Sequence, residues 1–315
     1  MTDFSALRAQ TSKSQTAGHF ELQIDGHKTS TFLKSVDGGW GKANVTDDPL
    51  GGDNKRSKHL TTVDVDPMSF EFGMSGASQV LQWIQGSWNR SFTRRNGQIT
   101  HANFDLKATF DHWFYNALIA ETTFPVLDGS SKDGAYIKCK IQPETVVTKK
   151  QPGTEAVASQ YTNKQKLWQP SAFRFTLDQM DEMQYANKIE SFTIKQNIKK
   201  HYTGAERFPE IEPTGIVFPN ISGTIALGYA DKLLQWHEDY IMKGKKDHQA
   251  QMSGAIEYLS PDRKSTIFRI NLLNVGLASA SVVQATANQD QIKRVKFEMF
   301  VGSMTLDGVG ALGLE

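Results

Sequence analysis

The sequence predicts a mainly β protein with two tandem antiparallel β-barrel or sandwich domains, each with one flanking α-helix. Three observations support this prediction. Short segments throughout the chain alternate apolar and polar residues, as half-buried strands do. Each half contains one amphipathic segment with the tripeptide Leu-Gln-Trp, at residues 81–83 and 234–236. Strands and helices do not alternate along the chain in the way that indicates a parallel sheet.

An internal repeat relates the two halves at a displacement of 153 positions. Residues 20–25 (FELQID) align at this displacement with residues 173–178 (FRFTLD). Residues 68–75 (MSFEFGMS) align with residues 221–228 (ISGTIALG), and the two Leu-Gln-Trp segments align as well. Three elements in the same order, without net slippage, indicate a duplication rather than chance.

The repeat divides the chain into five parts. Residues 147–170 are rich in polar residues, Gly and Pro and lack a sustained period, so we expect them to link two domains. The predicted parts are an N-terminal arm (1–17), a first barrel domain (18–146), the linker (147–170), a second barrel domain (171–307) and a flexible C-terminal tail (308–315).

Each predicted helix carries one apolar stripe that we expect to plug or cover its barrel. The stripe residues at helical spacing are Val80, Leu81 and Ile84 in the first helix and Leu233, Leu234 and Ile241 in the second. Trp83 and Trp236 occupy equivalent positions in these helices. We interpret both as packing anchors, with a ligand-stacking role as the alternative.

Composition argues against several classes of function. The 35 Lys and Arg residues balance 34 Asp and Glu residues, so no overall field attracts nucleic acid or an anionic membrane. Cys139 is the only cysteine, which excludes an internal disulfide and a zinc site built from several cysteines. The chain has no apolar run of the roughly 20 residues that span a bilayer and no apolar signal core. We expect folding in a cytoplasm without membrane anchoring.

Motifs for catalysis and for cofactor binding are absent or out of context. Residues 308–313 (GVGALG) fit the glycine pattern of a dinucleotide site, but the helix and second strand that such a site needs do not follow. His112 and His237 lack the paired spacing of metal ligands, and Cys139 lies in an alternating segment as a small apolar residue. We therefore predict no catalytic residue, no cofactor and no metal.

Two long polar segments occupy equivalent places in the two halves, at residues 45–60 and 199–213. Such long loops in compact domains usually have a function. We interpret the first as a candidate inter-subunit loop that becomes ordered on assembly, with a solvated excursion as the alternative. Its charged residues are Asp47, Asp48, Asp53, Lys55, Arg56 and Lys58.

An ordered set of motifs lies along the chain: residues 20–26, the segment 45–60, residues 208–227, residues 233–245 (LLQWHEDYIMKGK) and residues 265–279 (STIFRINLLNVGLAS). This set resembles the tail tube proteins of contractile bacteriophages, a family that includes the tubes of extracellular contractile injection systems and type VI secretion tubes. The resemblance covers residues 18–146 and 171–307. It implies small β-barrels with a flanking helix that form six-fold rings, which stack into a hollow tube and perform no chemistry.

The resemblance implies a structural role as a tail tube, tube initiator or baseplate hub adaptor. A common tube subunit has one domain, whereas this chain has two, so three copies supply six similar domains; a trimer is favoured and a hexamer is possible. Expected partners are tail tube, spike or baseplate proteins, with DNA or protein cargo passing through the lumen. Assembly is expected in the bacterial cytoplasm, as part of a virion tail or injection particle. The alternatives are a tandem barrel that binds a sugar, lipid or peptide, and an enzyme of unrecognised type.

Overall fold

The computed structural model describes residues 18–48, 56–74, 76–157, 168–245, 251–284 and 292–308, without the side chains of residues 27–31. The fold is mainly β, as predicted. The first half contains β1 (His19–Ile24), β2 (His27–Gly38), β3 (Gly41–Asp48), β4 (Ser57–Val65), β5 (Met68–Phe72), α1 (Ser78–Trp88), β6 (Arg95–Ala102), β7 (Ala108–Phe124), β8 (Leu127–Asp128), β9 (Ile137–Gln142) and β10 (Thr145–Lys150).

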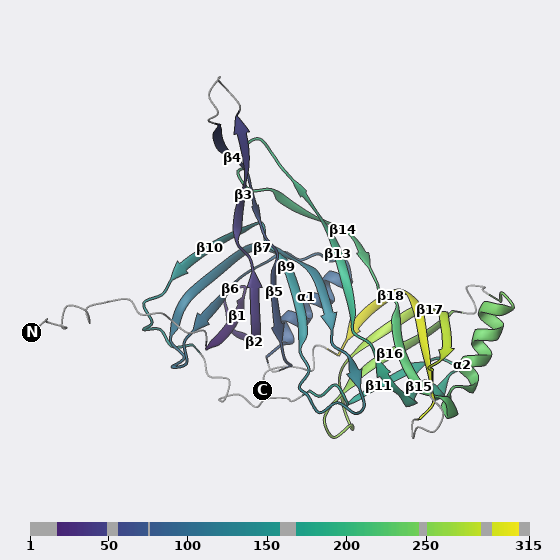
Figure 1. Ribbon diagram of the computed structural model, residues 1–315. Helices are drawn as coiled ribbons and strands as arrows, with labels where there is room; N and C mark the ends of the chain where they lie inside the picture. The colour runs from purple at the N-terminus through teal and green to yellow at the C-terminus, as the bar shows by residue number, and fades with distance from the viewer. Residues whose placement is uncertain are drawn as a thin grey trace, which may run out of the picture.

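The second half repeats this order of elements. It contains β11 (Phe173–Leu177), η3 (Asp181–Tyr185), β12 (Ala186–Ile189), β13 (Phe192–His201), β14 (Glu210–Val217), β15 (Ile221–Ala226), η4 (Leu227–Tyr229), α2 (Asp231–Trp236), the π-helical η5 (His237–Met242), β16 (Met252–Leu259), β17 (Thr266–Val282) and β18 (Arg294–Asp307). Each half therefore carries one helix between its early and late strands. The two sets of strands lie next to each other (Figure 1).

Six strands of the first half close into an antiparallel barrel. Pairing runs from β1 to β2, β5, β9, β7 and β6 and returns from β6 to β1. In β5, Met68, Phe70 and Phe72 are buried and alternate with half-buried polar residues, as the period of a half-buried strand requires. The α1 stripe of Val80, Leu81 and Ile84 is fully buried and belongs to the same core.

The second half repeats these pairings but stays open at one place. β11, β16, β17, β18, β15 and β12 follow one another in the order of the first barrel. In the described residues β11 does not pair with β12, because η3 replaces the strand that would continue β12 toward β11. β12 pairs instead with β8 of the first half. The two halves therefore share strands as well as a core.

Pairing registers follow the repeat residue by residue. Thr145 lies opposite Tyr115 in the first half, and Ser303 lies opposite Leu273 in the second, both displaced by 158 positions. Asn116 and Asn274, related by the same displacement, both have left-handed backbone, with φ of 50° and 55°. The repeat therefore includes backbone irregularities. The displacement grows from 153 at the helices to 158 at β7 and β17 because the second half has extra residues between its helix and β17.

A pair of facing core positions holds one large and one small side chain in both halves, but the large one lies on the opposite strand in the second half. In the first half the large Phe70 lies opposite the small Cys139. In the second half Gly223 lies opposite Phe297 at the equivalent positions. A Cβ atom on Gly223 would lie 2.6 Å from the Phe297 ring, so the glycine makes room for it. Dense core packing requires this compensation.

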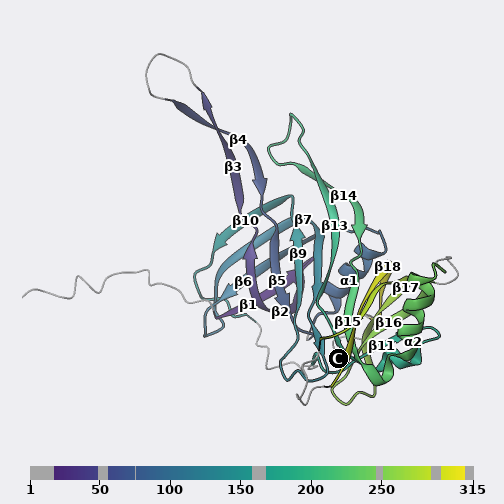
Figure 2. The same ribbon diagram turned by 45° about the vertical axis from the view of Figure 1, so that its right-hand side comes forward.

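Two predictions about connecting segments are wrong. Residues 147–150 belong to β10 and pair with β7, so the predicted linker begins too early. The long polar segments are hairpins rather than loops: β3 pairs with β4, and β13 pairs with β14. Figures 1 and 2 show both hairpins projecting from the same side of the molecule. The predicted flexible tail lies outside the described residues except for Gly308.

Candidate assembly surface

β7 and β13 pair across the two halves, which adds β13 and β14 of the second half to the sheet of the first barrel. The pairing is antiparallel and runs from Phe124 opposite Phe192 to Glu121 opposite Lys195. The Phe124 and Phe192 rings stack, with centroids 5.2 Å apart and an angle of 18° between planes. Both rings are buried in a core cluster that contains residues of both halves. This joint is therefore a strand-edge contact between two similar barrels, closed by an aromatic stack.

The same joint has a polar face. The hydroxyl oxygens of Thr123 and Thr193 lie 2.8 Å apart and share a hydrogen bond across the two strands. Glu121 lies opposite Lys195 and also forms an ion pair with Lys140 on β9, at 3.6 Å. The joint is thus held by backbone pairing, by an aromatic stack on its buried face and by side-chain hydrogen bonding on its polar face.

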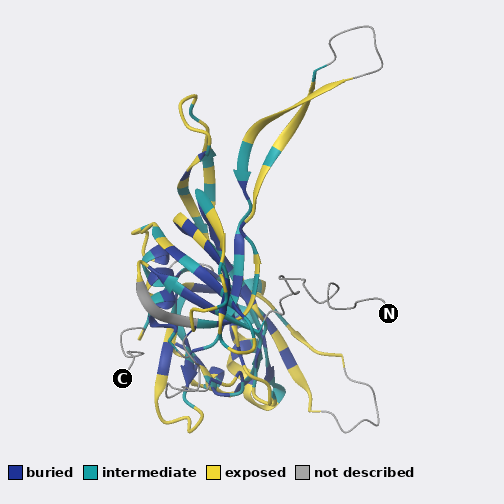
Figure 3. Ribbon diagram, turned by 90° about the vertical axis from the view of Figure 1, so that its left-hand side faces the viewer, coloured by how far each residue is buried: buried dark blue, intermediate teal, exposed yellow. Residues whose placement is uncertain are grey.

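The β3–β4 hairpin, called here the first arm, is almost fully exposed (Figure 3). Its strands bury no continuous face, so the alternation that marks a half-buried strand is missing from the sequence. Val45 and Leu60 are exposed although they lie opposite each other. The second arm is the β13–β14 hairpin, in which Lys199 lies opposite Glu212.

The charges of the first arm compensate one another within the hairpin. The Asp47 carboxylate lies 3.6 Å from the Arg56 guanidinium and 3.7 Å from the Lys58 ammonium group. Asp48 lies 3.9 Å from the His59 imidazole. These pairs are exposed, so each stabilises by only about 0.2–1 kcal/mol. The remaining predicted inter-subunit residues, Asp53 and Lys55, lie outside the described residues.

The bases of the arms are bound to each other and to the first barrel. Lys200 of the second arm forms an ion pair with Asp64 of the first arm. Arg94 donates hydrogen bonds to the Ile211 carbonyl oxygen at 2.7 Å and to Glu212 at 2.9 Å. These contacts fix the direction of the second arm relative to the first barrel.

Trp83 and Trp236 lie at equivalent positions of the two helices. Trp83 is 2% exposed, and its Nε1 donates a hydrogen bond to the Thr93 carbonyl oxygen at 2.8 Å. Trp236 is 8% exposed, and its ring centroid lies 5.7 Å from that of Tyr240. Beside Trp83, the Gln85 side-chain amide donates to the Leu306 carbonyl oxygen at 2.6 Å, which connects α1 to β18.

Two strand edges, one in each half, correspond by the repeat to the two sides of the β7–β13 joint. Residues 279–282 of β17 stand where residues 121–124 stand in β7, and only their β18 edge is paired in the described residues. Residues 39–42 stand where residues 192–195 stand in β13. On one side they bond residues 64–67, and on the other no strand pairs with them in the described residues, although the Gly39 carbonyl oxygen accepts a contact from His112. Val282 is 53% exposed, whereas its counterpart Phe124 is 0% exposed. Sequence analysis missed both edges, although the repeat displacement locates them.

The buried imidazole of His112 lies beside the edge at residues 39–42, and the half-buried imidazole of His101 lies on the neighbouring strand β6. A ring nitrogen of His112 lies 2.7 Å from the Gly39 carbonyl oxygen, and the Trp40 ring packs on His112 with centroids 4.9 Å apart. Burial lowers the pKa of His112. Burial, followed by repulsion from His112, lowers the pKa of His101, while the Asp111 carboxylate acts in the opposite direction. Both imidazoles are therefore held in the neutral form near pH 7.

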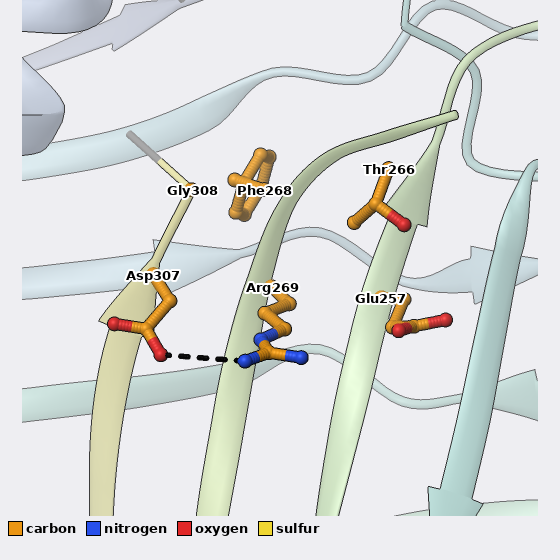
Figure 4. A pocket seen from close by; sticks show the side chains of 6 residues that line it. All are labelled: Glu257, Thr266, Phe268, Arg269, Asp307 and Gly308. Atoms are coloured by element: carbon orange, nitrogen blue, oxygen red, sulfur yellow. Dashed lines mark ion pairs between the residues drawn. The ribbon is translucent and has the colours of Figure 1, made fainter. Parts of the chain in front are cut away.

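The described part of the chain offers little for metal binding or thiol chemistry. No group of three or more His, Cys, Asp and Glu side chains there can hold a metal ion. Cys139 is buried, and burial raises the pKa of its thiol, as expected for an inert apolar residue. No described helix is long and apolar enough to cross a bilayer. A groove of about 350 Å³ is lined by Glu257, Thr266, Phe268, Arg269, Asp307 and Gly308 (Figure 4).

Comparison with solved structures finds matches of low sequence identity. A chain of the PVC sheath–tube complex of an extracellular contractile injection system is 16% identical, with a TM-score of 0.39, and the match covers 48% of this chain and 100% of that one. A chain of the anti-feeding prophage baseplate is 11% identical, with a TM-score of 0.32, and covers 44% and 91%. Hcp1 from Salmonella typhimurium is 16% identical, with a TM-score of 0.28, and covers 42% and 86%. No protein-family model and no curated protein matches the sequence.

Proposed function

We propose that this protein is a structural component of a contractile tail or injection particle, and that three copies form a ring of six similar barrels around an open centre. One observation carries the proposal. The chain contains a complete barrel-to-barrel joint between β7 and β13, and at residues 279–282 and 39–42 it presents a strand edge that pairs with no other strand in the described residues. The tail tube resemblance of the sequence agrees with this role.

Ring closure repeats the internal joint between neighbouring copies. The register of the internal joint places Val282 of one copy opposite Gly39 of the next, and Ser279 opposite Lys42. Each copy then uses a different surface on each side, which is the heterologous contact of a closed cyclic ring. The pairing also removes two exposed strand edges, which otherwise promote aggregation.

The joint between copies is expected to be weaker than the joint within a copy. Asp47 and Val217 stand where the ion pair of Lys200 and Asp64 stands inside the chain. The stacked Phe124 has Val282 as its counterpart. With fewer side-chain contacts, closure depends on backbone pairing and on a template, which suits a ring that is added to an existing tube end or baseplate.

The arms give such a ring two different faces. Both arms project from the same side of one copy (Figure 2), so a cyclic trimer presents six arms on one face. We propose that this face contacts the next layer of the particle: tail tube, spike or baseplate proteins. The balanced net charge of +1 suits a lumen through which DNA or protein cargo slides, because a strongly basic wall retains nucleic acid.

Mass measurement and cryo-electron microscopy of the purified chain and of its native particle test the proposal. A closed trimer with a central channel is expected. Val282→Lys places a charge in the between-copy joint and should weaken trimer formation by at least about tenfold, equivalent to about 1.4 kcal/mol. Leu273→Lys is the matched control, since Leu273 is also exposed on β17 but lies between Leu272 and Val275, which pair with β16. A monomer or two-fold dimer without a channel in the native particle overturns the proposal.

A further inference from the structure

The groove in Figure 4 lies where the first half of the chain has a covering segment. It opens beside the start of β17, at the end of β18. Arg269 and Asp307, which lie opposite each other, form the last pair between these two strands. Beyond that pair, the β18-side edge of β17 has no partner strand in the described residues.

The equivalent edge of β7 is covered by residues 151–157, which follow β10 directly. The Gln151 amide donates a hydrogen bond to the Thr109 carbonyl oxygen at 2.9 Å. The Ala108 amide donates to the Glu155 carbonyl oxygen at 2.8 Å, and Val157 donates to Leu106 at 2.7 Å. Backbone hydrogen bonds therefore extend the sheet past the end of β10.

Covering this edge also buries side chains. Val157 packs in a small apolar cluster with Ala102 and Ala108, and all three are buried. In the second half, Leu259 stands where Ala102 stands and is buried, but Thr266 stands where Ala108 stands and is exposed. The second half thus has the buried Leu259, but no described segment lies over it as residues 151–157 do in the first half.

The chain itself leads into the groove. Gly308 follows β18 and is part of the groove wall, with a left-handed φ of 82°. A Cβ atom on Gly308 would lie 3.2 Å from the Phe268 Cα atom, so the backbone passes close to β17 at this point. Residues 309–315 (VGALGLE) come next in the sequence, in the place that residues 151–157 have after β10. They include two leucines, Leu312 and Leu314.

We propose that residues 309–315 bind in this groove as an added strand on the free edge of β17. By the register of the first half, Val309 lies opposite Ile267, and the backbone near Gly313 accepts a hydrogen bond from the Thr266 amide. In the same register Glu315 takes the place of Val157, so backbone hydrogen bonds hold the added strand, and Leu312 and Leu314 add apolar contact of their own. This segment then completes the second barrel within one copy, independently of ring formation.

Hydrogen exchange in the monomer at low concentration tests the proposal. The Thr266 amide should be protected in the full chain, and removal of residues 309–315 should speed its exchange by at least about tenfold, equivalent to about 1.4 kcal/mol. The Ala108 amide, at the equivalent place in the first half, is the internal control and should not change. The double variant Leu312→Ser, Leu314→Ser should act in the same direction as the truncation.

Two results overturn the proposal. One is equal exchange at Thr266 with and without residues 309–315. The other is protection that arises only on assembly and persists in the truncated chain, which would show that a neighbouring copy or another protein fills the groove. Because the monomer is measured, a failure here leaves the ring proposal intact, and a chain that never forms rings leaves this test valid.

Discussion

The Phe124 and Phe192 rings stack with centroids 5.2 Å apart, and this contact holds the two barrels of one chain together. Phe124 also lies near the Tyr258 and Phe268 rings, with centroids at 5.9 Å and 6.3 Å. Four aromatic rings from both halves therefore meet at one point. The relation matters because the repeat places Val282, an exposed residue, at the position of Phe124.

Phe124→Ala should lower the free energy of unfolding by about 3–5 kcal/mol, since it removes a fully buried ring and leaves a cavity. Val282→Ala at the repeat-related position should change the monomer by less than about 0.5 kcal/mol, because its side chain is exposed. Urea unfolding of both variants measures the difference. Similar losses in the two variants would contradict the assignment of the joint.

Trp236→Ala should lower the free energy of unfolding by about 3–5 kcal/mol if Trp236 anchors the second helix. Trp83→Ala should have an effect of the same size, because the two residues are repeat-related and both buried. Trp40→Ala is the control, since Trp40 is 52% exposed. A loss below about 1 kcal/mol for Trp236→Ala would reopen a contact or ligand role for that ring.

Stability should fall as the pH drops below about 6.5, the usual pKa of histidine. Burial lowers the pKa of His101 and His112 in the folded chain, so the unfolded chain takes up protons first. The folded chain is therefore fully favoured above pH 6.5 and loses stability until the pH reaches the lowered folded pKa values. Near these rings, Asp111 opposes this effect at His101, and the Gly39 carbonyl opposes it at His112.

Chemical denaturation at several pH values, with His112→Asn as the comparison, measures this dependence. The variant should show a shallower loss below about pH 6.5, because it no longer contributes a proton-binding difference. An unchanged slope in the variant would mean that His112 does not contribute. A stability that rises on acidification through this range would contradict the sign of the prediction.

The segment that contains Asp53 and Lys55 should become protected from hydrogen exchange only on assembly. It combines glycines with charged residues and has almost no side chain to bury, so burial in a lone copy cannot offset its ordering entropy. Exchange of residues 49–55 in the monomer and in the assembled ring tests this expectation. The amides of β4 near Val65 serve as the control, because Val65 is buried in one copy. Equal slow exchange in both states would exclude the idea.

Charge substitution on the first arm should have little effect on the isolated chain. Asp47→Asn removes exposed pairs with Arg56 and Lys58 and should cost less than about 1 kcal/mol. Lys200→Met removes the pair between the two arms, which is less exposed, and should cost more than Asp47→Asn. Thermal unfolding of the two variants shows which substitution lowers the stability more. The reverse order would show that the contact between the arms is not structural.

The sequence by itself determined the class of the fold and the repeat. Period-two alternation in segments such as 68–72 and the Leu-Gln-Trp helices predicts strands and one helix per half, because a half-buried element must alternate or form a stripe. A residue-by-residue displacement of 153 then carries this pattern from one half to the other. Burial of one face of a strand or helix produces an apolar period in the sequence, so these features can be predicted without a structure.

The tertiary structure alone decided the arms and the joint. The arms bury no face, so their strands at residues 41–48 and 57–65 have no apolar period to read, and they resemble a polar loop. The joint depends on Phe124 meeting Phe192 across strands that belong to different halves of the repeat, and backbone pairing at an edge requires no particular side chain. The open barrel, the pairing of β8 with β12 and the uncovered edge of β17 likewise depend on which strands meet in space, since identical alternation is compatible with either outcome.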